Sequence, residues 1–229
     1  MPERRRTTTR SNIRGERALA HATLTALLLL TFCWPAQPQE RHEYAPIEER
    51  TINYADWTFK DLDGKPVNLR GFAQDKRLVL VVYFAPWCPN WRYEAPVISR
   101  LLDKYRTHGF EVVAISEYAP EEETRRFFGK ERPPYTVVIE SNARDARTQT
   151  THYAYRQRSG DRRNWGSPYN IFLEPVKLNS SGQLLTEKAW VANGELVEAE
   201  AEKFIRARLG LKEEGEKPPA CPATRPATR

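Results

Sequence analysis

The stretch FAPWCPNW, residues 84–91, contains the residue best suited to chemistry, Cys88. An apolar run leads directly into this cysteine, and a helix is expected to begin immediately after it. A cysteine at a helix N-terminus lies beside unsatisfied backbone N–H groups and the positive end of the helix dipole, which favour the thiolate. The sequence therefore predicts a nucleophilic thiol at Cys88.

The third position after Cys88 decides which thiol chemistry is open to it. A dithiol site usually carries a second cysteine there, and here the residue is Trp91. In a dithiol enzyme the second cysteine releases the mixed disulfide that the first one forms. Conventional two-cysteine reductase chemistry is therefore excluded. Two interpretations remain: monothiol exchange through Cys88, or a relic site in which bulky Trp91 crowds the sulfur.

The two other cysteines lie near the ends of the chain, Cys33 in the N-terminal segment and Cys221 in the C-terminal tail. A flexible arm of roughly ten residues spans up to about 33–36 Å, so Cys221 is a candidate resolving thiol for a Cys88 adduct. Its alternative is an incidental cysteine in a proline-rich tail. The cysteines and the four scattered histidines have no spacing that builds a zinc site, so neither a metal nor a cofactor is implied.

The N-terminal 36 residues are typical of a targeting segment. Six arginines and two glutamates accompany ALAHATLTALLLLTFCWPAQPQ, whose apolar centre is short of the roughly 20 residues of a comfortable membrane span. We expect export to an extracytoplasmic space, with residues 1–36 a signal peptide or an uncleaved signal anchor. Without these residues the net charge falls from +6 to +2, so nucleic acid is not an expected partner.

The rest of the chain alternates strands with helices. Three continuously apolar strands within residues 78–84, 110–116 and 135–141 indicate a sheet buried on both faces, which predicts a three-layer α/β domain. The predicted elements are a hairpin (57–69), a strand (78–84), a helix (92–107), a strand (110–116), a short helix (120–130), a strand (135–141), two further strands (169–173 and 184–191) and a closing helix (195–209). The predicted boundaries are a linker at 37–50, the domain at 51–211 and a disordered tail at 212–229.

Residues 142–164 form a polar insertion in this pattern. It holds six arginines against two aspartates, with tyrosines among them. It is interpreted as a solvated helix or, because it closely precedes Pro168, as a surface that docks partners. Arg92, on the helix after Cys88, is interpreted as a solvated residue rather than a substrate clamp.

From about Tyr54 to Leu209 the chain resembles the thioredoxin fold, in the TlpA/ResA-like branch of thiol–disulfide oxidoreductases. The segments that carry the resemblance are DWTFKDLDGKPVNL, VVYFAPWCPNWRYEAP, GSPYNIFL and LNSSGQLL. The second is similar to the W-C-x-x-C-R-x-E-x-P active-site pattern, and the third to a G-x-P-T segment. The chain departs from the family at Trp91, at Tyr169 in place of threonine, and at Val82 where thioredoxins keep a buried acid.

The resemblance implies roles for five residues. Cys88 is the nucleophile, Glu94 a carboxylate that modulates it, and Trp87 a flat contact surface beside the sulfur. Pro168 follows a cis bond and faces the cysteine, and Ser167 offers its backbone to an extended substrate. The implied partners are protein thiols or disulfides, or glutathione-like thiols.

Two other functions stay open at this point. One is a redox-inactive binding module that holds protein partners on the cis-proline face. The other is a thiol peroxidase, since peroxiredoxins share the fold. Their P-x-x-x-T-x-x-C pattern is not matched, however, because Ala85 and Val81 occupy the threonine and proline positions.

Overall fold

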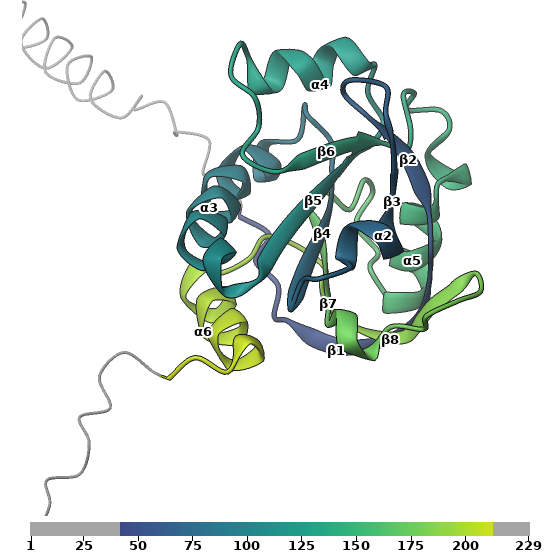
Figure 1. Cartoon of the computed structure of the whole chain (residues 1–229). Coiled ribbons are helices and arrows are strands. Elements are labelled where there is room, and N and C mark those ends of the chain that lie inside the picture. Colours follow the sequence, from purple (N-terminus) through teal and green to yellow (C-terminus); the bar gives the residue numbers. More distant parts are fainter. Residues whose placement is uncertain (1–41, 213–229) are drawn as a thin grey trace, which may run out of the picture. The chain divides into compact units, whose positions relative to one another are not determined.

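The computed structural model describes residues 42–212 (Figure 1). The expected signal segment, with Cys33, and residues 213–229 of the expected tail, with Cys221, lie outside the described residues. Within residues 42–212, no helix combines the length and the apolar character needed to cross a membrane.

A single mixed sheet organises the described residues, with the strand order β1-β8-β7-β4-β5-β6-β2-β3. The strands are β1 (Glu48–Ala55), β2 (Thr58–Asp61), β3 (Pro66–Asn68), β4 (Leu78–Phe84), β5 (Phe110–Ser116), β6 (Thr136–Ile139), β7 (Tyr169–Leu173) and β8 (Leu184–Ala192). β4, β5 and β6 run parallel, whereas β7 is antiparallel to β4. The carboxyl ends of β4, β5 and β6 therefore meet at one edge, where Cys88 follows β4.

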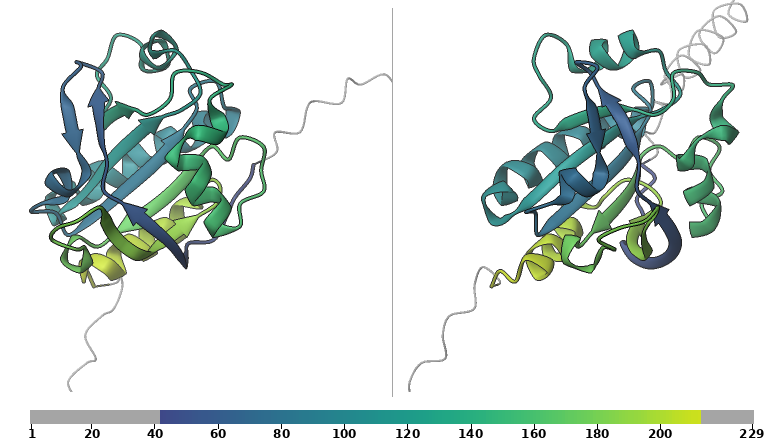
Figure 2. Two further views of the ribbon diagram at one scale, coloured as in Figure 1. Left: turned by 90° about the vertical axis from the view of Figure 1, so that its right-hand side faces the viewer. Right: turned by 45° about the vertical axis from the view of Figure 1, so that its right-hand side comes forward.

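Helices cover both faces of this sheet, which confirms the three-layer prediction (Figures 1 and 2). The helices are α2 (Leu69–Ala73), α3 (Pro89–Tyr105), α4 (Glu121–Phe128), α5 (Thr151–Ser159) and α6 (Glu198–Leu209). α3 and α6 pack on one face and α2 and α5 on the other. The fold is α/β and thioredoxin-like, with its hairpin, β2–β3, added beside β6 at one edge.

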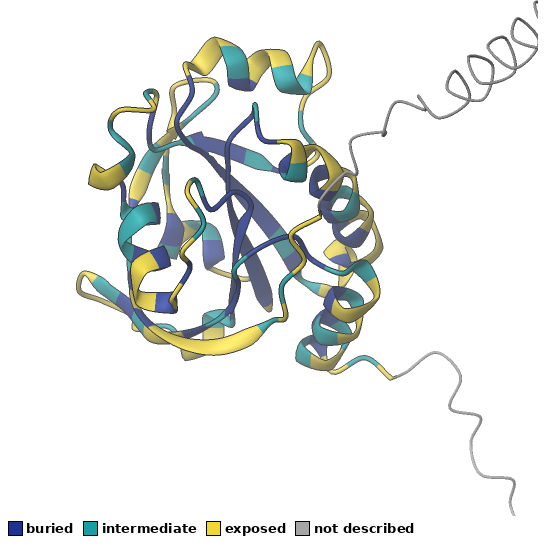
Figure 3. Ribbon diagram, turned by 180° about the vertical axis from the view of Figure 1, so that it is seen from behind, coloured by how far each residue is buried: buried dark blue, intermediate teal, exposed yellow. Residues whose placement is uncertain are grey.

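The central strand β4 is buried along its whole length, as Figure 3 shows for the middle of the sheet. Its alternate residues enter two separate cores: Val82 and Phe84 pack towards α3 and α6, and Val81 and Tyr83 pack towards α2 and α5. A strand with two covered faces needs apolar residues at every position, which is why its sequence does not alternate.

Two predicted boundaries differ from the structure. β1 begins at Glu48, inside the expected linker, because Ile52 and Tyr54 bury their side chains while the strand pairs with β8. The returning strand of the hairpin ends at Asn68 instead of continuing through Leu69. The Asn68 side chain accepts a hydrogen bond from the Gly71 N–H at 2.9 Å, and this cap starts α2.

The insertion is not a solvated helix. α5 packs against β1 and buries four of its side chains, His152, Tyr155, Arg156 and Ser159. The sequence suggested a solvated helix because arginine and histidine are usually exposed, and nothing in the local pattern marks Arg156 and His152 as buried. Their burial requires internal partners, which the site below provides.

Trp91 lies in the core beneath the first turn of α3. Its side chain is fully buried, its ring centroid is 4.4 Å from that of Phe84, and Phe127 of α4 lies 5.8 Å away. Its indole N–H makes no hydrogen bond with any residue between 42 and 212. Trp91 therefore contributes to the packing of α3 on β4 and α4.

We expect Trp91→Ala to lower the free energy of unfolding by about 3–5 kcal/mol, the range for removing a buried tryptophan side chain. Trp91→Phe should cost much less, because a phenyl ring keeps the contact with Phe84 and removes the unpartnered N–H. Urea unfolding at equilibrium measures both. If the two variants were equally destabilised, ring packing against Phe84 would not be the source of the stability that Trp91 contributes.

Candidate functional site

Cys88 occupies the N-cap of α3, at the point where the chain leaves β4. Its N–H donates to the Ala85 carbonyl at 2.9 Å, and its own carbonyl accepts from the Arg92 N–H at 3.3 Å. The residue is buried, with 8% of its surface exposed. This placement at the N-terminus of a 17-residue helix agrees with the prediction and exposes the sulfur to the helix dipole.

The loop before β7 lies against Cys88. The Cys88 thiol donates to the Ser167 carbonyl at 3.2 Å, and the Ser167 hydroxyl oxygen accepts from the Ala85 N–H at 2.9 Å. The Ser167–Pro168 peptide bond is cis, as the resemblance implied. Two hydrogen bonds thus join the chain around Cys88 to residues some 80 positions later, and they bring the predicted site residues together.

Trp87 forms one wall beside the thiol. Its indole N–H donates to the Tyr118 carbonyl at 3.1 Å, and its ring meets Trp165 edge to face at a centroid distance of 5.1 Å. The guanidinium of Arg144 lies 4.4 Å from the centre of the same ring. Trp87 is only half-buried, so part of its surface remains exposed, and its role as a contact surface beside the sulfur stays a prediction.

Glu94 lies in the interior rather than at the opening. It is 1% exposed, and its Oε1 accepts from the Asn170 side chain and the Leu196 N–H, both at 2.8 Å. Burial raises the pKa of Glu94 to about 8, although these two hydrogen bonds act in the opposite direction. The carboxyl group is therefore mostly neutral at pH 7. Among the described residues it shares no direct hydrogen bond with Cys88, and it links α3 to β7.

A second buried carboxyl group follows β5. Glu117 is fully buried, and burial, followed by the nearby Glu140, raises its pKa well above the ordinary value. The position where thioredoxins keep a buried acid is the apolar Val82 here. The burial of Glu117 was not predicted from the sequence. A glutamate directly after an apolar strand normally marks the start of an exposed loop.

The insertion braces the loop that carries Ser167. Arg163 donates to the Pro168 carbonyl at 2.8 Å and to Asp161 at 2.8 Å. Asp161 also accepts from the Nε of Arg156 at 3.1 Å, and all three side chains are largely or fully buried. This Arg156–Asp161–Arg163 network was not predicted. The sequence signal was the close spacing of these charges immediately before the Gly-Ser-Pro segment.

Gly166 and His152 also help to hold the loop that carries Ser167. A Cβ atom on Gly166 would lie 1.7 Å from the Nε of Arg156, and the φ of Gly166 is +59°, so only glycine fits. The Nε2 of His152 donates to the Gly166 carbonyl at 3.2 Å, while its Nδ1 accepts from the Tyr118 hydroxyl at 2.9 Å. Burial lowers the pKa of His152 well below its ordinary value, so it remains neutral.

Other predicted features stand apart from this arrangement. Cys221 lies outside the described residues, so its resolving role stays a prediction. Within residues 42–212, no three histidine, cysteine, aspartate or glutamate side chains gather as a metal site would require.

Comparisons with known proteins agree with the fold. The sequence model of the AhpC/TSA family matches residues 53–158. Over 92 residues the chain is 25% identical to the thiol-disulfide oxidoreductase ResA of Halalkalibacterium halodurans, which covers 40% of this chain and 49% of that protein. Over 66 residues it is 38% identical to the chloroplastic phospholipid hydroperoxide glutathione peroxidase 1 of Arabidopsis thaliana. That match covers 29% of this chain and 26% of the relative. The chain thus spans half or less of the length of these relatives.

Solved structures with this arrangement of strands and helices include two from Bacteroides. The thioredoxin domain of a thiol-disulfide oxidoreductase from Bacteroides vulgatus has a TM-score of 0.50 at 19% identity and covers 71% of this chain and 98% of its own. A thiol:disulfide interchange protein from Bacteroides sp. has a TM-score of 0.50 at 19% identity, with coverages of 73% and 93%. At this identity the likeness establishes the fold.

We expect Arg163→Gln to lower the free energy of unfolding by about 1.5–3 kcal/mol, the range for hydrogen bonds to charged groups, because it removes the guanidinium hydrogen bonds to Asp161 and to the Pro168 carbonyl. The neighbouring Arg162 is exposed, so Arg162→Gln is the matched control and should stay within about 0.5 kcal/mol of the wild type. Urea unfolding measures both. Equal stability of the two variants would contradict the bracing role.

Glu94 should make stability depend on pH between its unfolded and folded pKa values. From pH 4.5 to about 8 the folded chain retains a proton on Glu94 that the unfolded chain loses, so the free energy of unfolding falls as pH rises. Glu94→Gln removes this titration and mimics the neutral carboxyl group.

The measurement is urea unfolding of wild type and Glu94→Gln from pH 5 to 9. We expect the variant to gain stability relative to wild type as pH rises to about 8 and the difference then to level off. Glu122→Gln, at an exposed position on α4, is the control and should run parallel to wild type. A Glu94→Gln curve that also ran parallel would show that Glu94 does not titrate in this range.

Proposed function

We propose that this chain, which has a thioredoxin-like fold and is similar to the thiol-disulfide oxidoreductase ResA, exchanges thiols and disulfides through the single site cysteine Cys88. One observation carries the proposal: the thiol lies at the N-terminus of α3, 3.2 Å from the Ser167 carbonyl beside Pro168. The positive end of the helix dipole lies at that position, which is a common setting for nucleophilic cysteines. The same carbonyl is a backbone group that an extended substrate can approach.

The exchange begins when the Cys88 thiolate attacks one sulfur of a substrate disulfide. The substrate S–S bond breaks, a mixed disulfide forms with Cys88, and the second substrate sulfur leaves as a thiolate. A thiol from a protein or from a glutathione-like molecule then attacks the mixed disulfide and restores Cys88. The third position after Cys88 is Trp91, so this resolving thiol comes from elsewhere, with Cys221 a candidate within the chain.

Other residues around Cys88 have supporting roles in this proposal. Trp87 offers a flat contact surface to the segment that carries the reacting sulfur. Glu94 modulates the site from the interior: it holds Asn170, two residues after Pro168, and adds no negative charge at neutral pH. Residues 1–36 would direct the protein to an extracytoplasmic space, as a cleaved signal peptide or as an anchor in the membrane.

A redox-inactive binding module is the second candidate, and the low exposure of Cys88 favours it. In that case the site around Pro168 holds protein partners and the thiol takes no part. A thiol peroxidase is the third, supported by the similarity to a relative named for glutathione peroxidase activity. Ala85 opposes it, because this position offers no hydroxyl group to activate a peroxide.

Reaction of Cys88 with glutathione disulfide tests the proposal, in a full chain with Cys33→Ser and Cys221→Ser. We expect the folded protein to form the mixed disulfide faster at pH 7 than the urea-unfolded chain, because only the folded chain has the α3 dipole beside the sulfur. Mass spectrometry follows the adduct, and Cys88→Ser is the control that should form none. Slower reaction in the folded state would favour the binding module, and consumption of a hydroperoxide would favour the peroxidase.

A further inference from the structure

A groove of about 280 Å³ opens beside Cys88, between the start of α3 and the end of α4. It is lined by Pro86, Trp87, Arg92, Glu123, Arg126 and Phe127. Cys88 does not itself line the groove, but two of the lining residues are its neighbours: Trp87 directly precedes it, and the Arg92 N–H is bonded to the Cys88 carbonyl. Trp87 and Phe127 supply apolar surface, and the charged side chains lie around it.

The side chains of the two arginines of this groove have no partner within the described part of the chain. The side chains of Arg92 and Arg126 make no hydrogen bond or ion pair with any residue in the described part of the chain, and both residues are exposed. Other surface arginines differ. Arg125, adjacent to Arg126, pairs with Glu121, and Arg100 on α3 pairs with Glu198.

A third guanidinium adds to this charge. Arg144 lies over the Trp87 ring at 4.4 Å and has no carboxylate partner between residues 42 and 212. Within the lining of the groove, Arg92 and Arg126 face one carboxylate, Glu123, which has no ion pair within the described residues. The surface around Trp87 therefore carries a net positive charge that a ligand can neutralise.

We propose that this surface selects an acidic polypeptide segment, with carboxylates beside the cysteine that reacts with Cys88. The inference rests on the proposed exchange function and names its substrate class. Trp87 and Phe127 would contact the apolar parts of the segment. Arg92, Arg126 and Arg144 come from α3, α4 and the insertion, and this spread over three elements suits carboxylates distributed along a chain better than a single small anion.

The test uses the full chain with Cys33→Ser and Cys221→Ser and three peptides that differ only around one cysteine, with acidic, amide or lysine neighbours. Each peptide carries thionitrobenzoate on its cysteine as a mixed disulfide. Attack by Cys88 joins it to the peptide and releases the coloured thiolate, whose appearance gives the rate constant. We expect the acidic peptide to react about tenfold faster than the amide peptide at low salt, and the lysine peptide more slowly.

Salt and substitution identify the cause of this preference. The advantage should shrink as the screening length falls from about 30 Å at 0.01 M to about 3 Å at 1 M ionic strength. Arg92→Gln with Arg126→Gln should remove most of it.

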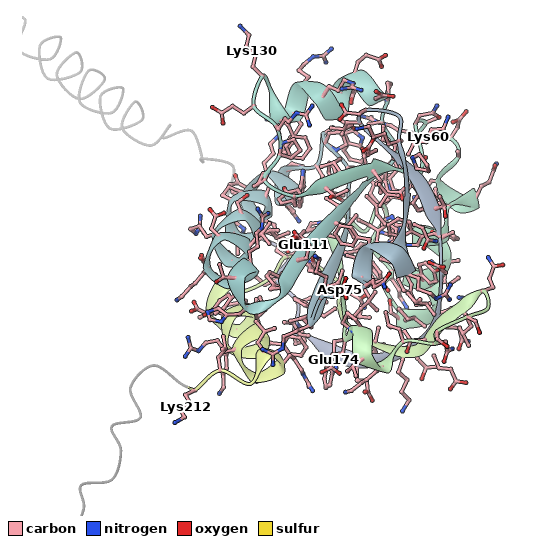
Figure 4. All side chains as sticks on the ribbon, in the orientation of Figure 1. Lys60, Asp75, Glu111, Lys130, Glu174 and Lys212 are labelled. Atoms are coloured by element: carbon pink, nitrogen blue, oxygen red, sulfur yellow. The ribbon has the colours of Figure 1, made fainter. Side chains whose placement is uncertain are left out.

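The matched control is Lys203→Gln with Lys212→Gln, which removes two exposed charges and should keep the preference. Lys203 follows Glu202, which pairs with Lys104, about 24 Å along α3 from Cys88. Lys212 lies just beyond α6, away from α4 (Figure 4).

Three results would overturn the inference, and they separate it from the proposed function. Equal rates for the acidic and amide peptides would refute charge selection while the exchange function stood. The mixed disulfide of glutathione with thionitrobenzoate releases the same leaving group, and if it reacted as fast as the acidic peptide, the choice of a polypeptide would be refuted. If no peptide reacted with Cys88, the exchange function itself would be wrong.

Discussion

The contact between Cys88 and the loop before β7 is the constraint on which the rest of the site depends. The thiol and the Ala85 N–H both bond to Ser167, so the end of β4 and the start of α3 are fixed against the Pro168 segment. Each of these hydrogen bonds is worth only about 1 kcal/mol on its own. Their effect on geometry is larger, because they fix the Cys88 sulfur against the Ser167–Pro168 segment.

Such a loop keeps its position only if its other side is supported, and the insertion provides that support. Arg163 bonds to the Pro168 carbonyl, and Asp161 joins Arg163 to the buried Arg156. A buried ionic network adds little net stability when it is complete, and its loss is costly because each remaining charge is left without a partner. That asymmetry makes the network suited to fixing one conformation of the loop.

The sequence predicted the parts of the site whose signals are local. The apolar run into Cys88 placed the thiol at a helix start, and the Gly-Ser-Pro segment placed Ser167 and Pro168 opposite it by resemblance to a family. The insertion was misjudged for the opposite reason. The burial of Arg156 and His152 depends on partners such as Asp161 and Tyr118 that the fold brings close. The spacing of hydrophobic residues cannot reveal a polar residue whose burial depends on polar partners elsewhere in the chain.

The charges around the thiol follow from the same division between buried and exposed groups. Burial raises the pKa of both Glu94 and Glu117, so neither carboxyl group contributes much negative charge beneath the site at neutral pH. The exposed guanidiniums of Arg92 and Arg126 keep their charge because water solvates them. The exposed charge on this side of the molecule is therefore carried by guanidiniums, while the carboxyl groups beneath the site are buried. Ionisation of Glu94 near pH 8 would add a negative charge beneath the site.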